Sequence, residues 1–387
     1  MIAFDFLDRP QLDKNISEDN QYSRETAYKM ASESAVLLKN DGILPLKPGR
    51  KTKTVILGPN ADVIPCGGGS GKVSPLYSIS LYAGMQELGK NYPVQLVTPD
   101  ENGSYDTPEN VKAIESATTV IVVAGFNTKT EKENSDRTFT LPEGQDELIS
   151  FAAAHNQNVV TVVYAGGGFD MSKWMDKVKA IVLGWYPGQE GGLALARMLA
   201  GEFSPSGRLP MSIEAKWEDN PVHDSYYPKE KAENKRGFTN RYVTYSEGVF
   251  MGYRGYDRLG TKPLFPFGYG LTYTTFDYKD IAVTPSGEGF DVTFTLTNTG
   301  LKAAAEVVQV YVGEQNPTVA RPKKELKGYD KIYLSKGESR LVTIFLPKSA
   351  FEFYDVNIHD FRANNGKFNV MVGASAEDIR LNAEITR

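Results

Sequence analysis

The stretch "TVIVVAGFN" at residues 119–127 decides the fold class, because its unbroken run of Val, Ile and Ala leaves no polar residue for a solvent-facing side. A strand of this kind is buried on both faces, which requires helices on both sides of a mostly parallel sheet. Related runs occur at four other places: "TVILGPNA" (54–61), "VQLVTPD" (94–100), "VVTVVYAGGG" (159–168) and "AIVLGWYPG" (180–188). Helical patterns lie between them, so the sequence predicts an α/β sandwich domain.

Nearly every one of these runs ends in Gly, Asn, Asp or Pro, as in "GPN", "TPD", "AGFN" and "AGGG". In open parallel sheets, binding clefts form beyond the carboxyl ends of the strands. We therefore expect these loops to line the functional face of the domain.

A further helix is expected before the first run, in "SRETAYKMASESAVLLKNDG" at residues 23–42. Its predicted N-cap is Ser23, and Gly42 is expected to end it. Leu37 and Leu38 fall on the apolar face of this predicted helix together with Ala27, Met30, Ala31 and Ser34.

The pattern changes from "PLFPFGYGLTYTTFDY" (263–278) onward to short alternating runs separated by turn residues. This spacing predicts a second domain of antiparallel strands packed as an all-β sandwich. We place the α/β domain at 23–265 and the sandwich at 266–387. The segment "AKWEDNPVHDSYYPKEKAENKRGFTNRYVTY" (215–245) between them is rich in charge, Asn and Tyr, which is typical of disorder or of a functional lid.

Composition excludes several classes of function. Hydrophobic residues make up 41% and charged residues 24%, and no apolar run approaches the roughly 20 residues that cross a bilayer. A net charge of -5 with dispersed basic residues argues against a nucleic-acid partner. One cysteine (Cys66) and three scattered histidines offer no internal disulfide and no metal-ligand cluster, so neither metal nor cofactor is expected.

The N-terminal segment "MIAFDFLDRPQLDKN" lacks the basic region and the cleavage site of a signal peptide. Its Phe and Ile cluster reads as the tail of an element whose body lies upstream. The compartment stays open, because a chain without disulfides is compatible with the periplasm, the exterior and the cytoplasm.

The glycine run "CGGGSGKVSP" (66–75) is the first candidate for a site. It matches neither phosphate-binding glycine motif in spacing, so a nucleotide site rests on the glycines alone. Either the run is a tight turn that needs positive φ angles, or its bare backbone lets a ligand approach, with Ser70 beside Gly69 supplying a hydroxyl.

The charged loop "TEKENSDRTFTLPEGQ" (130–145) is the second candidate. Glu131, Glu133, Asp136 and Arg137 combine carboxylates with a guanidinium, as a catalytic loop would. A solvated loop with weak surface ion pairs explains the same residues, and the residues alone favour that explanation.

Glu247 in "TYSEGVFMGYRGYD" (244–257) is the third candidate, since it sits inside a run of aromatic residues. Desolvation by Tyr242, Tyr245, Phe250 and their neighbours would raise the pKa of this carboxyl and suit it to act as a general acid. The aromatics also suit a sugar-stacking surface. A structural role on a β-turn is the commoner reason for such a charge, and composition alone favours it.

Taken together, the motifs resemble glycoside hydrolase family 3, the family of β-glucosidases and related exo-acting enzymes. The resemblance runs in family order from about residue 5 to the C-terminus, through "ASESAVLLKNDGILPL", "ILGPNA", "GGGSG", "DRTFTLPEGQDELI", "GWYPGQEGG", "GEFSPSGRLPMS", "YSEGVFMGYRGYD", "PLFPFGYGLTYTTF", "TNTGLKAAAEVVQVYV" and "RPKKELKGYDKIYLSKGES". It implies a (β/α)8 barrel, an α/β sandwich domain and a fibronectin type III-like sandwich. The last two match the domains expected here, and residues 1–22 resemble the barrel's exit helix and linker.

The resemblance assigns roles to single residues. Glu247 matches the general acid/base of a retaining enzyme, and Ser70, beside Gly69, matches a residue that reaches the sugar. Asp136 and Arg137 lie in a matching stretch and are carried along as possible sugar contacts. The aspartate nucleophile belongs to a Ser-Asp-Trp motif of the barrel, which this sequence lacks, as it lacks the barrel's Lys-His pair.

A lone acid cannot carry out double displacement. The resemblance therefore implies that this chain is inactive by itself and needs a barrel domain or chain that carries the nucleophile. Its expected substrates are β-linked glucosides or short oligosaccharides. The alternative is a non-catalytic carbohydrate-binding or assembly module with the same fold.

Overall fold

The computed structural model describes residues 2–10, 15, 17, 19–133, 135–227, 229–233 and 239–387. The first domain contains the strands β1 (Val36–Asn40), β2 (Thr54–Leu57), β3 (Val94–Val97), β4 (Thr119–Gly125), β5 (Val159–Tyr164) and β6 (Ala180–Leu183). Its α-helices are α1 (Gln21–Ser34), α2 (Leu81–Glu87), α3 (Pro108–Ser116), α4 (Gln145–His155) and α5 (Gly191–Leu199).

These strands form one sheet in the order β1-β6-β5-β4-β2-β3. Strands β2 to β6 run parallel, and β1 alone pairs antiparallel, with β6. Apolar residues of α3 and α4 pack on one face of the sheet, and those of α2 and α5 pack on the other. The predicted α/β sandwich is confirmed, because each strand can bury its Val and Ile side chains on both faces.

The predicted helix over residues 23–42 is wrong at both ends. The N-cap is Asn20, whose Oδ1 accepts a hydrogen bond of 2.8 Å from the N–H of Ser23. The helix stops at Ser34, and Leu37 and Leu38 belong to β1 instead. Both leucines are buried on opposite faces of the sheet, so the backbone pairing with β6 and the burial on two faces outweigh the helical spacing of the apolar residues.

The second domain is the expected all-β sandwich. It contains β9 (Phe276–Ser286), β10 (Gly289–Asn298), β11 (Ala304–Glu314), β12 (Glu325–Leu334), β13 (Ser339–Leu346), β16 (Lys367–Gly373) and β17 (Ile379–Thr386). The sheet β13-β10-β9 faces the sheet β12-β11-β16-β17, and all pairings are antiparallel. A small hairpin of β14 (Phe353–Asp355) and β15 (Asp360–Arg362) extends from one end.

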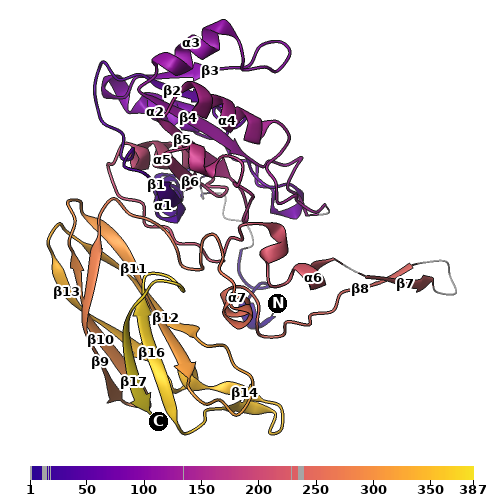
Figure 1. Cartoon of the computed structure of the whole chain (residues 1–387), viewed down its shortest axis with the longest axis vertical. Coiled ribbons are helices and arrows are strands. Elements are labelled where there is room, and N and C mark those ends of the chain that lie inside the picture. Colours follow the sequence, from indigo (N-terminus) through magenta and orange to yellow (C-terminus); the bar gives the residue numbers. More distant parts are fainter. Residues whose placement is uncertain are drawn as a thin grey trace.

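The segment between the two domains has local structure of its own. It contains the 3₁₀ turn η5 (Trp217–Asp219), α6 (His223–Tyr226), the hairpin of β7 (Lys229–Glu233) and β8 (Thr239–Tyr242), and α7 (Tyr253–Leu259). Figure 1 shows the hairpin reaching away from the body of the molecule. The predicted disordered or lid segment at 215–245 thus holds regular elements, and its residues 228 and 234–238 lie outside the described part of the chain.

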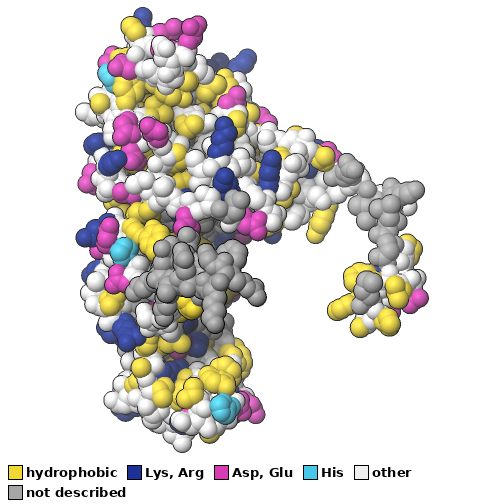
Figure 2. All heavy atoms as spheres, turned by 90° about the vertical axis from the view of Figure 1, so that its right-hand side faces the viewer, with side chains coloured by type: hydrophobic (Ala, Val, Ile, Leu, Met, Phe, Trp, Pro, Cys, Tyr) yellow, Lys and Arg dark blue, Asp and Glu magenta, His cyan; other side chains and the backbone are white. Residues whose placement is uncertain are grey.

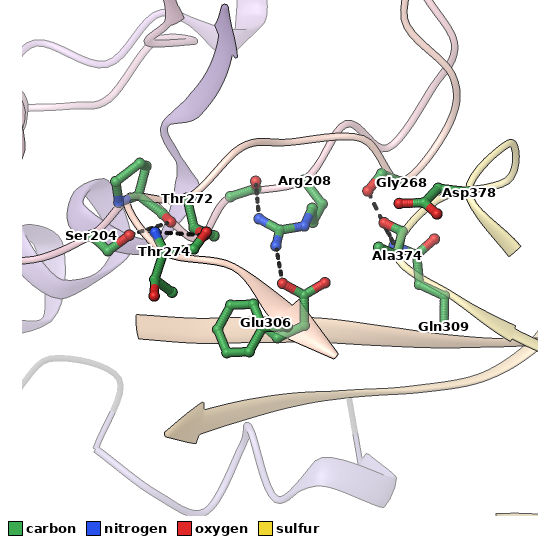
Figure 3. Close-up of polar contacts among 12 residues, drawn as sticks. Ser204, Arg208, Gly268, Thr272, Thr274, Glu306, Gln309, Ala374 and Asp378 are labelled. Carbon is green, nitrogen blue, oxygen red and sulfur yellow. Dashed lines mark hydrogen bonds and ion pairs between the residues drawn. The ribbon is translucent and has the colours of Figure 1, made fainter. Parts of the chain in front are cut away.

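The two domains are joined by buried polar contacts (Figure 3). Arg208, in the chain that leaves α5, lies 3.0 Å from the Glu306 carboxylate on β11, and both side chains are less than a tenth exposed. The Gln309 amide nitrogen on the same strand donates hydrogen bonds to the carbonyls of Gly268 and Ala374, at 3.1 and 2.7 Å. The Arg208–Glu306 pair joins the two domains, and the Gln309 hydrogen bonds hold the start of the second domain, at Gly268, against its own sandwich.

Candidate active site

The glycine run follows β2 and packs against the loop that follows β4. Gly68 donates a backbone hydrogen bond of 2.8 Å to Glu131, and Gly69 begins a short 3₁₀ turn with φ of +84°. A Cβ atom on Gly69 would lie 2.5 Å from the Cβ of Glu133. Glycine is therefore required here for two reasons, the left-handed φ and the close approach of the two loops.

This packing fixes Ser70, one of the predicted sugar contacts. Its hydroxyl and its backbone N–H both donate to the same Glu133 oxygen, Oε2, at 2.6 and 2.7 Å. The side-chain and backbone hydrogen bonds from Ser70 lower the pKa of Glu133. Glu133 was seen in the sequence only as one charge of the loop, and the structure makes it the residue that orients Ser70.

Arg137 is held in place by three contacts. Its guanidinium lies 4.6 Å from the centre of the Phe126 ring, donates a hydrogen bond of 2.7 Å to the Gly168 carbonyl and faces Glu131 at 3.7 Å. Glu131 in turn accepts hydrogen bonds from the Tyr186 hydroxyl and the Gly166 N–H, at 2.6 and 3.2 Å. Burial and Glu131 raise the pKa of Tyr186. Glu131 therefore fastens three loops at the carboxyl edge of the sheet.

Asp136 is exposed, and it lies beside Tyr226 of α6. Burial, followed by the charge of Asp136, raises the pKa of Tyr226. The residue before it, Ser225, donates a hydrogen bond of 3.0 Å to Oε2 of Glu247. The loop after β4 and the Glu247 loop thus both meet α6, on the side of the molecule where Figure 1 shows the β7–β8 hairpin.

Glu247 lies in the turn that precedes α7 and is half-buried. The aromatic surroundings expected from the sequence are divided. Tyr245 is exposed, whereas Tyr253 stacks on Phe267 and Tyr256 is buried in the domain. Tyr253 and Tyr256 lie three residues apart on one face of α7, whereas Tyr245 precedes that helix. Glu247 therefore stays within reach of a ligand, held by Ser225 and not enclosed by rings.

A cleft of about 440 Å³ opens next to these loops. Its walls come from the loops after β4 and β5, from η5 and from the start of α7, with Arg137, Gly168, Glu214, Trp217, Tyr226 and Tyr256 among the lining residues. Glu214 is 5% exposed, and its Oε1 accepts a hydrogen bond of 3.2 Å from Asn220. Burial raises the pKa of this carboxyl, against the opposing effects of its hydrogen bonds and of Arg137.

Glu214 belongs to none of the three candidate sites that the sequence indicates. The only available signal was a single Glu directly after the apolar "LPMSI" (209–213), beside Trp217 and Asn220. Among the residues that the structure describes, no group of three or more His, Cys, Asp or Glu side chains is arranged to hold a metal ion. In the same part of the chain, no helix combines the length and the apolar character that crossing a bilayer requires.

The chain thus combines a mostly parallel α/β domain, with polar loops at the carboxyl edge of its sheet, with an antiparallel β-sandwich. Residues 35–253 match the model of the glycosyl hydrolase family 3 C-terminal domain, and residues 306–376 match that of the fibronectin type III-like domain. The chain belongs to glycoside hydrolase family 3, as its motifs suggested.

Three similar proteins illustrate the match. Thermostable beta-glucosidase B of Acetivibrio thermocellus is 36% identical over 96% of this chain and 50% of its own length. An exo-alpha-(1->6)-L-arabinopyranosidase of Bifidobacterium breve is 37% identical over 92% of the chain and 47% of its own. The crystal structure of a Bifidobacterium adolescentis beta-glucosidase of this family superposes with a TM-score of 0.86 at 34% identity, covering 97% of this chain and 55% of that one. The chain spans about half the length of the curated relatives it matches.

Proposed function

We propose that this chain supplies the general acid/base, Glu247, and part of the sugar site of a retaining β-glycosidase. The nucleophile would lie in a barrel domain or chain that completes the site, and glucosides are the proposed substrates. The observation that supports this proposal is the position of Glu247, a half-buried carboxyl that accepts a hydrogen bond from Ser225 of α6, next to the residue that Asp136 contacts. The beta-glucosidase names of two of the relatives support the substrate class.

In the proposed mechanism, the protonated Glu247 gives its proton to the leaving glycosidic oxygen while the partner carboxylate attacks the anomeric carbon. The resulting carboxylate then takes a proton from water, which releases the sugar from the covalent intermediate. Ser225 fixes the Glu247 carboxyl through the hydrogen bond to Oε2, and this contact restricts the directions in which the acid can point.

Ser70 suits the proposed sugar contact because its proton is committed. Its hydroxyl donates to Glu133, so the lone pairs of the oxygen remain to accept a hydrogen bond from a sugar hydroxyl. Asp136 and Arg137 are proposed as further sugar contacts, with less support. The Arg137 guanidinium already contacts the Gly168 carbonyl and the Phe126 ring. Asp136 lies beside Tyr226 of α6.

Exposed apolar residues at the N-terminal end support the need for a further part of the enzyme. Ile2, Phe4 and Leu7 are between 65% and 79% exposed, and Phe6 is 39% exposed. Figure 2 shows a small, mainly hydrophobic group that stands apart from the body at the right. Such a group is stabilised when another surface covers it, and a barrel domain is the cover that we propose.

The test combines this chain with the part of the Acetivibrio thermocellus relative that this chain does not cover and measures hydrolysis of aryl β-glucosides. Neither part alone should hydrolyse the substrate, and the mixture should. In the mixture, Glu247→Gln should lower kcat by about 10²–10⁴-fold, because the leaving oxygen then departs without a proton. The loss should shrink for aryl groups that leave readily, since these need less acid assistance.

The matched control is Glu288→Gln, which makes the same change on an exposed turn of the sandwich and should leave kcat unchanged. Activity in the mixture that survives Glu247→Gln with every leaving group would remove the acid role and support the binding or assembly module. Hydrolysis by this chain without the barrel would contradict the proposed division of the site.

A further inference from the structure

The cleft beside α7 has the dimensions of a small-molecule site and is built entirely from this chain. Its volume of about 440 Å³ falls within the range of roughly 300–1,000 Å³ that is usual for ligand pockets. It lies at the carboxyl ends of the parallel strands β4 and β5, where open α/β sheets bind their ligands. Glu247 is not among the residues that line it.

Three buried polar atoms in the cleft wall have no hydrogen-bond partner in the part of the chain that the structure describes. They are the Tyr256 hydroxyl, the Trp217 indole nitrogen Nε1 and the Arg137 nitrogen Nη1. Tyr256 is only 3% exposed. More than nine in ten buried polar groups in folded proteins are hydrogen-bonded, and an unpaired one costs about 1–3 kcal/mol. An occupant that accepts hydrogen bonds would satisfy these three atoms, whose side chains all line the same cleft.

The side chains that carry these atoms are fixed, so the arrangement does not depend on mobile groups. Arg137 is tied to Gly168 and Phe126. Trp217 packs edge-on against Tyr226, with the ring centres 5.0 Å apart. Tyr256 belongs to α7. A preorganised set of donors loses little conformational entropy when a ligand binds.

The same cleft also contains an acceptor and flat apolar surfaces. Glu214 lines the cleft and contributes a carboxyl group, whose Oε1 accepts a hydrogen bond from Asn220. The rings of Tyr226 and Tyr227 line the same cleft. An anion would satisfy the donors but would meet the Glu214 carboxyl. A neutral molecule with several hydroxyl groups satisfies both, because each hydroxyl accepts and donates, and its C–H groups can pack on the rings.

We propose that this cleft binds one sugar-sized polyol, as a site separate from the one that contains Glu247. The sugar can be a free monosaccharide or one unit of an oligosaccharide, since both present the same hydroxyls. The site is linked to the candidate active site through α6, where Ser225 contacts Glu247 and the next residues line the cleft. The proposal does not require that Glu247 is catalytic.

The test titrates the whole chain, without a barrel, with D-glucose, cellobiose and D-gluconate, and follows binding by NMR or calorimetry. Glucose should bind at millimolar concentrations, and gluconate should bind more weakly because of its carboxylate. Equal affinities for cellobiose and glucose would identify a site for a free monosaccharide. A higher affinity for cellobiose would identify a site for one unit of a longer chain.

Tyr256→Phe is the decisive variant, because it removes a hydroxyl that is already unpaired. Glucose binding should weaken about tenfold while the thermal midpoint stays the same or rises. Tyr329→Phe, the same change at an exposed position of β12, should alter neither. A chain that binds no sugar, or a Tyr256→Phe variant that loses stability but keeps its affinity, would overturn the proposal. So would tighter binding of gluconate than of glucose.

Discussion

At the scale of single residues, the candidate site is assembled by side chains that orient one another across loops. Ser70 is fixed by Glu133, and Glu247 is fixed by Ser225, in both cases through a carboxylate that accepts from a hydroxyl. Glu131 does the same with Tyr186. Hydrogen bonds to a charged acceptor are the stronger ones, so these loops acquire defined positions without regular secondary structure.

Glu214 leads to a prediction about pH. Burial raises the pKa of its carboxyl above the ordinary value of 4.5, so the folded chain holds this proton more tightly than the unfolded chain. The stabilisation from this group is complete below about pH 4.5 and is lost as the pH rises through the folded pKa. Glu214→Gln cannot ionise, and we expect it to be more stable than the wild type above this window and equally stable below it.

Urea unfolding across the pH range measures this difference. Glu218→Gln, an exposed neighbour on η5, should follow the wild-type curve at every pH. A Glu214→Gln variant that is less stable than the wild type at neutral pH would show that the ionised carboxyl stabilises the fold.

At the scale of elements, glycines allow two helices to approach more closely than any side chain permits. A Cβ on Gly84 of α2 would lie 2.5 Å from the Gly192 carbonyl oxygen, and one on Gly192 of α5 would lie 2.2 Å from the Ile79 carbonyl oxygen. The N–H of Gly192 donates to that same carbonyl at 3.1 Å. The contact of α2 with α5 is therefore backbone against backbone, and it seals one face of the sheet.

Gly192→Ala should separate these helices and destabilise the α/β domain. Overpacking costs about 1–3 kcal/mol, and here the obstacle is backbone, which cannot turn aside as a side chain would. This cost exceeds the roughly 1 kcal/mol by which Ala favours a helix over Gly. Gly71→Ala is the control, because a Cβ there meets nothing within 4 Å. Equal urea midpoints for the two variants would show that the helices can move apart freely.

At the scale of the whole molecule, the sandwich and the α/β domain are held by a buried ion pair. One carboxylate oxygen of Glu306 pairs with the Arg208 guanidinium at 3.0 Å, and the other accepts a hydrogen bond of 3.0 Å from the Tyr278 hydroxyl. Arg208 comes from the first domain and Glu306 from the second (Figure 3), and Tyr278 lies on β9 of the second domain.

Arg208→Ala should destabilise the chain by about 3–5 kcal/mol, because it leaves the buried Glu306 without its cation. Arg340→Ala removes the same side chain from an exposed pair, in which Arg340 lies 2.6 Å from Glu338, and should cost at most about 1 kcal/mol. Urea unfolding followed by tryptophan fluorescence, for the α/β domain, and by circular dichroism compares the two variants. Similar losses for both would mean that the interface contributes little to the joined fold.

The local sequence was sufficient to predict an element where its residue pattern corresponds to one state of burial. The runs of Val and Ile predicted β2 to β6 and their helices, because a strand buried on both faces has no polar positions. It was insufficient at Leu37 and Leu38, where the helical spacing of apolar residues hid a strand whose partner, β6, lies about 140 residues further along the chain.

By itself, the sequence determined the α/β domain, the sandwich, the family motifs and the candidates Glu247 and Ser70, because each depends on residue type and on short spacing. The tertiary structure alone decided what each candidate contacts: Glu133 for Ser70, Ser225 for Glu247 and Gly168 for Arg137. It alone placed Glu214, Trp217 and Tyr256 around one cleft. The physical reason is that burial and hydrogen bonding are set by residues distant in the chain, which only the folded backbone brings together.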